Sequence, residues 1–423
     1  MQTEMKQFWG LIENGLVDWL SSDTYFLLKR ILTVIFPLVW LSAMAELVVK
    51  GCLTSNGYYY QTLGVKNWLP GLSVWRTFFQ LLQQIPAHLI AIMGCYVTAE
   101  WVSRFSGDHK RWVGITAVAG YLMLNTSSLS GSNATFYGAS LGYKGLFLAV
   151  MVGYFVGWII RLANHRTDSI TTQNTIRGWA LGMVILFAGI GLLVREFVTT
   201  GLVNVFYRFL TYPFQSTTKL LAMLGESLLN GFYWLIGLNG PLAINNNDVV
   251  SSLENFAYVI THDSLKNLPY PVTFHTVVDT FATFGGPGMT LGLIIAILLA
   301  SDDHHERRIT WLSLVPGLGN LNLPLLVGIP VVLNPVYGIP FLLAPLASIG
   351  IAFGLLKLGW LVPVVYPLYN AIPGPFQGFF GSGGHLSGLI VGLICLLVSV
   401  AIYYPFVKWN ARLQGRIEER RSE

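Results

Sequence analysis

The chain has 423 residues, of which 53% are hydrophobic and only 11% are charged. Soluble domains carry about 25% charged residues, so this composition excludes an ordinary soluble protein and predicts an all-α polytopic membrane protein. The apolar runs are continuous rather than alternating, which disfavours a membrane β-barrel. The net charge of +5 is typical of cytoplasmic loops, and no basic patch with interleaved aromatic residues indicates nucleic-acid binding.

The first half of the chain contains regular apolar segments. They follow an amphipathic helix over residues 1–20, which is expected to lie along the membrane interface with Trp9 and Trp19 as anchors. Basic residues gather near 30 and in the later loops of this half, and these ends are expected in the cytoplasm. The expected spans are, in chain order, about 31–49, 75–102, 112–124, 145–160 and 179–194.

The second half departs from this pattern. Residues 201–238 predict one long helical stretch that is too charged for a simple span, and residues 239–271 are polar and loop-like. Later apolar segments, at about 289–300, 343–361 and 386–406, are separated by interrupted regions. The regular first half predicts a scaffold, and the interrupted second half predicts the part that contacts a substrate.

The most informative interruption is the apolar stretch 315–350, which contains six prolines together with Asn320, Asn322 and Asn334. Each proline removes a backbone donor and disrupts the helical hydrogen-bond ladder. In lipid, such backbone is tolerated only where protein or a water-filled cavity surrounds it. Interrupted apolar segments indicate where a transporter binds its solute. We therefore predict that a polar solute contacts the protein here.

His275 and Asp279 form a second polar feature within apolar sequence. They are four residues apart, which on a helix places both on one face. Ionisable residues inside a membrane are functional candidates by default. The alternative is a structural hydrogen-bonded pair.

Four blocks of the second half resemble the enzyme IIC (EIIC) membrane subunit of the bacterial phosphotransferase system (PTS), in its lactose, cellobiose and chitobiose branch. The third block is the most specific, because it combines closely spaced prolines and asparagines in an apolar context. The blocks are 234–240 (WLIGLNG), 279–291 (DTFATFGGPGMTL), 316–340, and 387–406, which begins SGLI and ends YYPF.

This resemblance implies about ten transmembrane helices with re-entrant hairpins and a homodimer in the bacterial plasma membrane, with both termini in the cytoplasm. It implies a disaccharide or β-glycoside permease with an elevator-type motion, and IIB and IIA partner subunits that supply phosphate to a sugar hydroxyl. The expected division is residues 1–200 as scaffold and dimerisation half, 201–229 as connecting or interfacial helix, 230–407 as transport half and 408–423 as basic tail.

The resemblance also assigns candidate residues for contact with the sugar. Amides offer a donor and an acceptor to hydroxyl groups, although they also cap broken backbone, and glycines allow close backbone approach. The candidates are Asn239, Gly240, Gly285, Gly286, Asn320, Asn322, Leu323, Tyr369 and Asn370. No metal or cofactor is expected, since the three cysteines are scattered and no phosphate-binding loop occurs.

Two positions depart from the family pattern, which has His at Asn239 and Glu at Leu323. Phosphoryl transfer to a hydroxyl requires a group that takes the hydroxyl proton, and Leu cannot do so. Three interpretations stay open. His275 and Asp279 substitute as catalytic residues of a phosphoenolpyruvate-dependent phosphotransferase, the protein transports sugar without phosphorylation, or it is a membrane receptor or assembly component.

Overall fold

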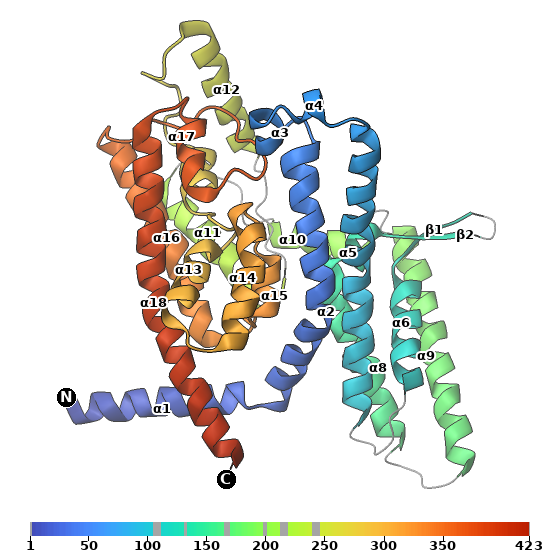
Figure 1. Ribbon diagram of the computed structural model, residues 1–423. Coiled ribbons are helices and arrows are strands. Elements are labelled where there is room, and N and C mark those ends of the chain that lie inside the picture. The colour runs from blue at the N-terminus through green and yellow to red at the C-terminus, as the bar shows by residue number, and fades with distance from the viewer. Residues whose placement is uncertain are drawn as a thin grey trace.

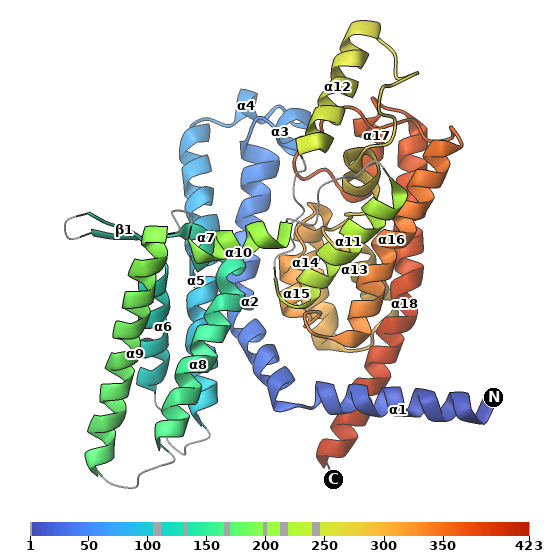
Figure 2. The ribbon, with the colours of Figure 1, turned by 180° about the vertical axis from the view of Figure 1, so that it is seen from behind.

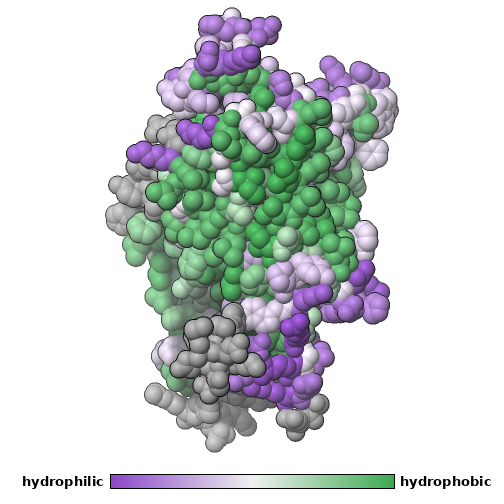
Figure 3. All heavy atoms as spheres, turned by 90° about the vertical axis from the view of Figure 1, so that its left-hand side faces the viewer, coloured by the Kyte–Doolittle hydropathy of each residue, from purple (hydrophilic) through white to green (hydrophobic). Residues whose placement is uncertain are grey.

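The computed structural model describes residues 2–104, 111–130, 133–164, 170–197, 201–211, 219–238 and 246–422, and this part of the chain is almost entirely helical. Seen from one side, its surface carries a broad hydrophobic band between hydrophilic ends, as a membrane-spanning protein requires (Figure 3). The described helical segments that are long and apolar enough to cross a membrane are Asp23–Leu53, Leu72–Ser103, Tyr143–Ala163, Gly178–Glu196, Pro335–Lys357 and Leu386–Arg420.

The N-terminal half forms a group of helices on one side of the molecule (Figures 1 and 2). Helix α5 (Leu72–Ser103) is central, because it packs against α2 (Asp23–Val48), α6 (Arg111–Leu124) and α8 (Leu146–Asn164). Helix α9 (Ile170–Phe197) covers α6. The expected amphipathic helix, α1 (Gln2–Leu20), lies crosswise to these spans near the two chain termini.

Two glycines account for the close packing of α8 on α5. A Cβ atom on Gly153 would lie 2.5 Å from the carbonyl oxygen of Cys95, and one on Gly157 would lie 2.9 Å from that of Ala99. Small residues four positions apart let two membrane helices bring their backbones together. The sequence spacing of Gly153 and Gly157 therefore determines this contact.

The C-terminal half contains several helices that are too short to cross a bilayer. They are α13 (Thr290–Ala300), α14 (His304–Leu318) and α15 (Leu323–Gly328). Two long helices, α16 (Pro335–Lys357) and α18 (Leu386–Ser422), pack on each other, and α13 packs on α18. The predicted total of about ten spans stays a prediction, since α6 and α13 are apolar but short.

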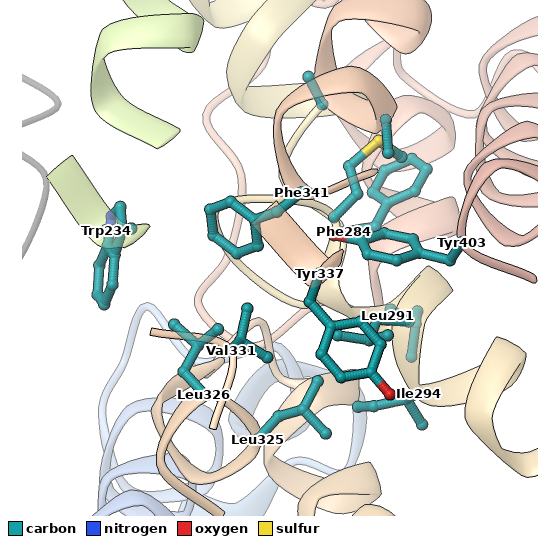
Figure 4. Packing of buried hydrophobic residues seen from close by; sticks show 14 of the residues in the cluster. Trp234, Phe284, Leu291, Ile294, Leu325, Leu326, Val331, Tyr337, Phe341 and Tyr403 are labelled. Carbon is teal, nitrogen blue, oxygen red and sulfur yellow. The ribbon is translucent and has the colours of Figure 1, made fainter. Parts of the chain in front are cut away.

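Aromatic residues fill the core of this half. Phe284, Tyr337, Phe341 and Tyr403 are buried together (Figure 4). The Tyr403 hydroxyl donates a hydrogen bond to the carbonyl oxygen of Gly288 at 2.5 Å, and a Cβ on Gly288 would collide with the ring of Phe341. The glycine-rich break therefore places bare backbone directly against aromatic rings.

The proline-rich stretch is an interrupted helix. Helix α14 passes through Pro316 and ends at Leu318, and α15 covers only six residues. Pro324 and Pro335 lie in the first turns of α15 and α16, where a missing N–H removes no intrahelical bond. In the turn between α14 and α15, residues 319–321 are half-buried and Asn322 is buried.

Three stretches differ from the sequence-based expectation. Residues 201–238 contain two helices, α10 (Leu202–Thr211) and α11 (Leu220–Leu235), in place of one. The stretch expected as a loop contains α12 (Asn246–His262), and the loop after α6 contains an antiparallel hairpin of β1 (Thr126–Ser130) and β2 (Asn133–Phe136). Smaller elements are α3 (Tyr58–Thr62), α4 (Val65–Trp68), α7 (Gly138–Leu141), α17 (Gln377–Gly381), the 3₁₀ turns Tyr143–Gly145 and Gly374–Phe376, and the π-turns η1 (Val49–Leu53) and η4 (His275–Asp279).

Helix α12 has a tertiary partner that hydropathy alone does not reveal. The Asn255 side chain accepts a hydrogen bond from the Tyr270 N–H at 3.0 Å and donates one to the Tyr270 carbonyl oxygen at 2.6 Å. Val259 of the same helix is buried against Leu268 and Val365. These contacts stabilise a helix whose sequence is otherwise polar.

Candidate functional site

A cavity of about 410 Å³ lies where the two halves of the chain meet. The end of α2 and the π-turn η1 form one wall, and η4, the turn after α14 and the segment before α17 form the others. We call it the inner cavity. Five residues predicted from the sequence line it: His275, Asp279, Asn320, Tyr369 and Asn370.

His275 and Asp279 share one face, as their spacing predicts, but the turn that carries them is a π-helix. The Thr280 hydroxyl donates to the carbonyl oxygen of His275 at 2.7 Å, which satisfies a backbone acceptor in the widened turn. The His275 Nδ1 atom lies 3.6 Å from Asp279 Oδ2, and the side chains are 23% and 45% exposed. The imidazole is thus beside a carboxylate and open to a solute, which suits a proton acceptor.

Asn320 joins the two broken regions of the C-terminal half. Its Oδ1 atom accepts a hydrogen bond from the Gly285 N–H at 3.0 Å, and its Nδ2 atom donates to the carbonyl oxygen of Ile372 at 2.8 Å. The amide therefore positions backbone, and it also lines the inner cavity. Each amide atom has capacity for one further hydrogen bond, which a solute hydroxyl would fill.

Backbone strain marks two residues of the cavity wall. Asn320 and Ala371 have φ angles of 63° and 63°. A left-handed conformation is costly for residues other than glycine and is least unfavourable for Asn. Such strain persists where the surrounding structure enforces it, and it is concentrated at functional sites.

Gly285, Gly286 and Asn322 lie behind the wall and do not line the inner cavity. The two glycines have φ angles of 78° and 99°, and a Cβ on Gly286 would lie 3.0 Å from the Asn322 side chain. Asn322 is buried, and its Nδ2 atom donates to the Pro287 carbonyl oxygen at 3.4 Å. These contacts join the glycine-rich turn before α13 to the turn between α14 and α15.

The remaining predicted residues are placed differently. Leu323 begins α15, is half-buried and packs on the hydrophobic core, away from the residues that line the inner cavity. Asn239 and Gly240 lie outside the described residues. Within the described part of the chain, no group of three His, Cys, Asp or Glu residues is arranged to hold a metal ion.

The inner cavity is also lined by residues that the sequence-based assignment did not include, among them Leu47, Lys50 and Gln377. Gln377 is 8% exposed, and its Oε1 atom has no hydrogen-bond partner in the described structure. A buried acceptor without a partner costs about 1–3 kcal/mol, and the residue that carries it is part of the cavity wall. Gln377 lies in the interrupted region 366–384, whose prolines and glycines were the available sequence signal.

The ionisable side chains around the inner cavity lie in two close pairs. Lys50 lies 2.5 Å from Glu46, one helical turn earlier, so its positive charge is largely compensated. Asp279 faces His275 from the same π-turn. A site with paired charges, amides and an exposed tyrosine ring suits a neutral solute with many hydroxyl groups.

Interrupted membrane helices that enclose a polar cavity are characteristic of a solute transporter. The family model described as "Phosphotransferase system, EIIC" matches residues 29–345 of this chain, and the chain belongs to that family. The expected family and its helical membrane fold are thereby confirmed.

Several relatives are similar over part of the chain. It is 28% identical over 242 residues to the cellobiose-specific EIIC component of Lactococcus lactis subsp. lactis (strain IL1403), covering 51% of this chain and 48% of that protein. It is 34% identical over 291 residues to the putative permease IIC component YwbA of Bacillus subtilis (strain 168), covering 64% of each. The matched regions thus span 48% to 64% of these relatives.

A solved structure is also similar. This is the transporter ChbC, the IIC component from the N,N'-diacetylchitobiose-specific phosphotransferase system, with a TM-score of 0.44 and 18% sequence identity over 95% of this chain and 96% of that one.

Proposed function

We propose that the chain is a IIC-type permease subunit that carries a β-linked disaccharide or related glycoside, and that the sugar binds in the inner cavity. The observation that carries this proposal is the convergence of Asn320, Asn370 and the unpartnered Gln377 on one cavity of about 410 Å³. Small-molecule sites have volumes of roughly 300–1,000 Å³ and a few convergent polar groups. Tyr369, which is 41% exposed, offers an aromatic face for a sugar ring.

His275 is the proposed proton acceptor for phosphoryl transfer. A IIB partner would approach with phosphate on its cysteine, the S–P bond would break, and an O–P bond would form to the sugar hydroxyl. His275 would take the hydroxyl proton, and Asp279, at 3.6 Å, would stabilise the resulting imidazolium. This pair would replace the acceptor that the family places at Leu323.

Transport would require the C-terminal half to move against the N-terminal half, because both halves contribute to the inner cavity. Partners would be IIB and IIA subunits, membrane lipid and a second copy of the chain bound through the N-terminal half. Both termini would lie in the cytoplasm of a bacterium, since α1 and the basic end of α18 lie at the same end of the molecule (Figure 1).

Uptake of labelled disaccharides into cells, with and without the IIB protein, tests the proposal. Free and phosphorylated sugar in the cytoplasm are measured separately. His275→Gln and Asp279→Asn should keep sugar binding and lose at least about tenfold in phosphorylated product. Phosphorylated product that persists in the double variant would eliminate His275 and Asp279 as the catalytic pair.

Leu323 favours a second candidate function, in which the protein moves sugar without phosphorylation or acts as a receptor or assembly component. A leucine packed on the core cannot take a proton. Asn239→His combined with Leu323→Glu restores the family residues. Phosphotransfer that arises only in this double variant would support the degenerate function, whereas no change would count against it.

A further inference from the structure

A second cavity, of about 760 Å³, lies at the end of the molecule that carries α12 and α17, opposite α1 and the chain termini (Figures 1 and 2). We call it the outer cavity. It is formed by the end of α12 and the loop after it, the segment after α16 and the residues before α18. Its volume falls in the range of small-molecule sites, roughly 300–1,000 Å³.

The lining of the outer cavity combines an apolar floor with polar sides. Leu268 and Leu361 are buried, and the Tyr366 ring is held at its edge by Phe256, with ring centroids 6.2 Å apart at 81°. Hydroxyl, amide and charged groups surround this floor: Asp263, Ser264, Lys266, Asn267, Ser382 and His385.

The charges of the outer cavity favour a neutral polar ligand. Asp263 and Lys266 are both exposed at its rim, and in the described structure neither has an ion-pair partner. Opposite charges at one rim give no net attraction for an ion of either sign. An aromatic ring beside mixed donors and acceptors matches a sugar, which has apolar ring faces and hydroxyl edges.

The segment 361–371 contributes to the wall of both cavities, through different residues. Leu361, Val362 and Tyr366 face the outer cavity, and the next residues, from Pro367 to Ala371, line the inner one. Ligands in the two cavities would therefore contact adjacent parts of one short segment.

This wall is attached to the elements that carry the inner site. The N–H groups of Val365 and Tyr366 donate to the carbonyl oxygen of Gly381 at 2.9 and 3.0 Å, which ties the wall to α17, the helix that begins with Gln377. The Thr276 hydroxyl donates to the carbonyl oxygen of Val364 at 3.0 Å, which ties the wall to the π-turn of His275 and Asp279.

We infer that the outer cavity is a second binding site for the same class of neutral glycoside, connected to the inner site through the segment 361–371. The inference rests on the proposed function of the inner cavity. The second site holds a sugar molecule next to the transport site.

Equilibrium dialysis of the full-length protein in nanodiscs, with radiolabelled cellobiose and β-mannobiose, tests the inference. The native protein is expected to bind one molecule of sugar tightly and a second about tenfold or more weakly. Val362→Trp fills the outer cavity and should abolish only the weaker binding. If Val362→Trp does not fold, Lys266→Trp makes the same test, because this residue lies at the exposed rim and its substitution leaves the interior unchanged.

A matched substitution in the inner cavity completes the experiment. Gln377→Leu should weaken the tight binding and leave the weaker one in place. Saturation of the native protein at one molecule, or a second molecule unaffected by both tryptophan substitutions, would overturn the second site while leaving the proposed function standing. Absence of any sugar binding would overturn both.

Discussion

The backbone N–H of Asn370 donates a hydrogen bond to the carbonyl oxygen of Asn56 at 2.9 Å, across the boundary between the two halves of the chain. The Tyr58 N–H donates back to the Asn370 carbonyl oxygen at 3.0 Å, and Gly57 lies between them in an isolated parallel bridge with Asn370. Asn370 lines the inner cavity. The loop after α2 therefore positions a site residue that belongs to the opposite half.

Gly57→Ala tests this bridge. A Cβ on Gly57 would lie 2.6 Å from the Lys50 carbonyl oxygen and would also collide with that of Gly51. Overpacking of this kind costs about 1–3 kcal/mol, and the loop should move away from Asn370. We expect a lower melting temperature and weaker sugar binding. Gly354→Ala, where a Cβ meets nothing within 4 Å, is the control, and equal effects of both substitutions would contradict the prediction.

Two substitutions of Asn320 should separate the effect of its hydrogen bonds on stability from the effect of its strained backbone. Asn320→Ala removes both backbone hydrogen bonds and keeps a strained φ angle of 63°. Asn320→Gly removes the same bonds but relieves the strain, so it should be more stable than the alanine variant by about 1 kcal/mol. Thermal unfolding in detergent measures the difference. A glycine variant no more stable than the alanine variant would show that the positive φ angle is not strained.

Gln377 distinguishes a binding residue from a structural one. Its Oε1 atom is buried without a partner, so Gln377→Leu removes an unsatisfied acceptor and should leave stability unchanged or raise it by about 1 kcal/mol. The affinity for sugar should fall, because an amide side chain of the inner cavity wall is replaced by an apolar one. Melting temperature and dialysis on the same sample give both quantities. A large loss of stability would indicate a structural role instead.

The contact of α1 with the end of α18 should depend on packing more than on charge. Arg416 lies 2.9 Å from Glu13, and Arg420 lies 2.8 Å from Asp18, but these side chains are 38% to 70% exposed. Exposed ion pairs contribute about 0–1 kcal/mol. Arg416→Ala should therefore shift the melting temperature only slightly.

Leu413 is the matched comparison, because it is 1% exposed in the cluster that joins α1 to α18. Leu413→Ala should cost about 2–5 kcal/mol. The two substitutions are compared in the same detergent by thermal unfolding. An Arg416→Ala effect as large as that of Leu413→Ala would show that the ion pairs dominate this contact.

The regular spans and the broken proline-rich helix could be predicted from the sequence, because apolar length and proline position act locally. The facing positions of His275 and Asp279 followed from their spacing for the same reason. Helix α12 could not be predicted, since it depends on the bonds between Asn255 and Tyr270. Its stabilising partner lies 15 residues further along the chain.

The contribution of the N-terminal half to the inner cavity was also beyond sequence reasoning. Lys50 directly follows an apolar span, as an ordinary lysine at a helix end does. It reaches the inner cavity only because the two halves of the chain pack against each other there. The unpartnered amide oxygen of Gln377 could not be predicted for a related reason. Whether a buried amide has a partner depends on neighbours from distant segments, and no local pattern records their absence.

Two π-turns, η1 and η4, supply Lys50, His275 and Asp279 to the same cavity. A π-turn holds one residue more than the α-turn it replaces. Deleting a single residue from either one would restore ordinary winding and rotate the neighbouring helix by roughly 100°. Two homologues with the same residues on both sides of a π-turn, but with one residue fewer within it in one of them, would then present different side chains to the solute. Preference for a sugar would in that case evolve through insertions and deletions as readily as through substitutions.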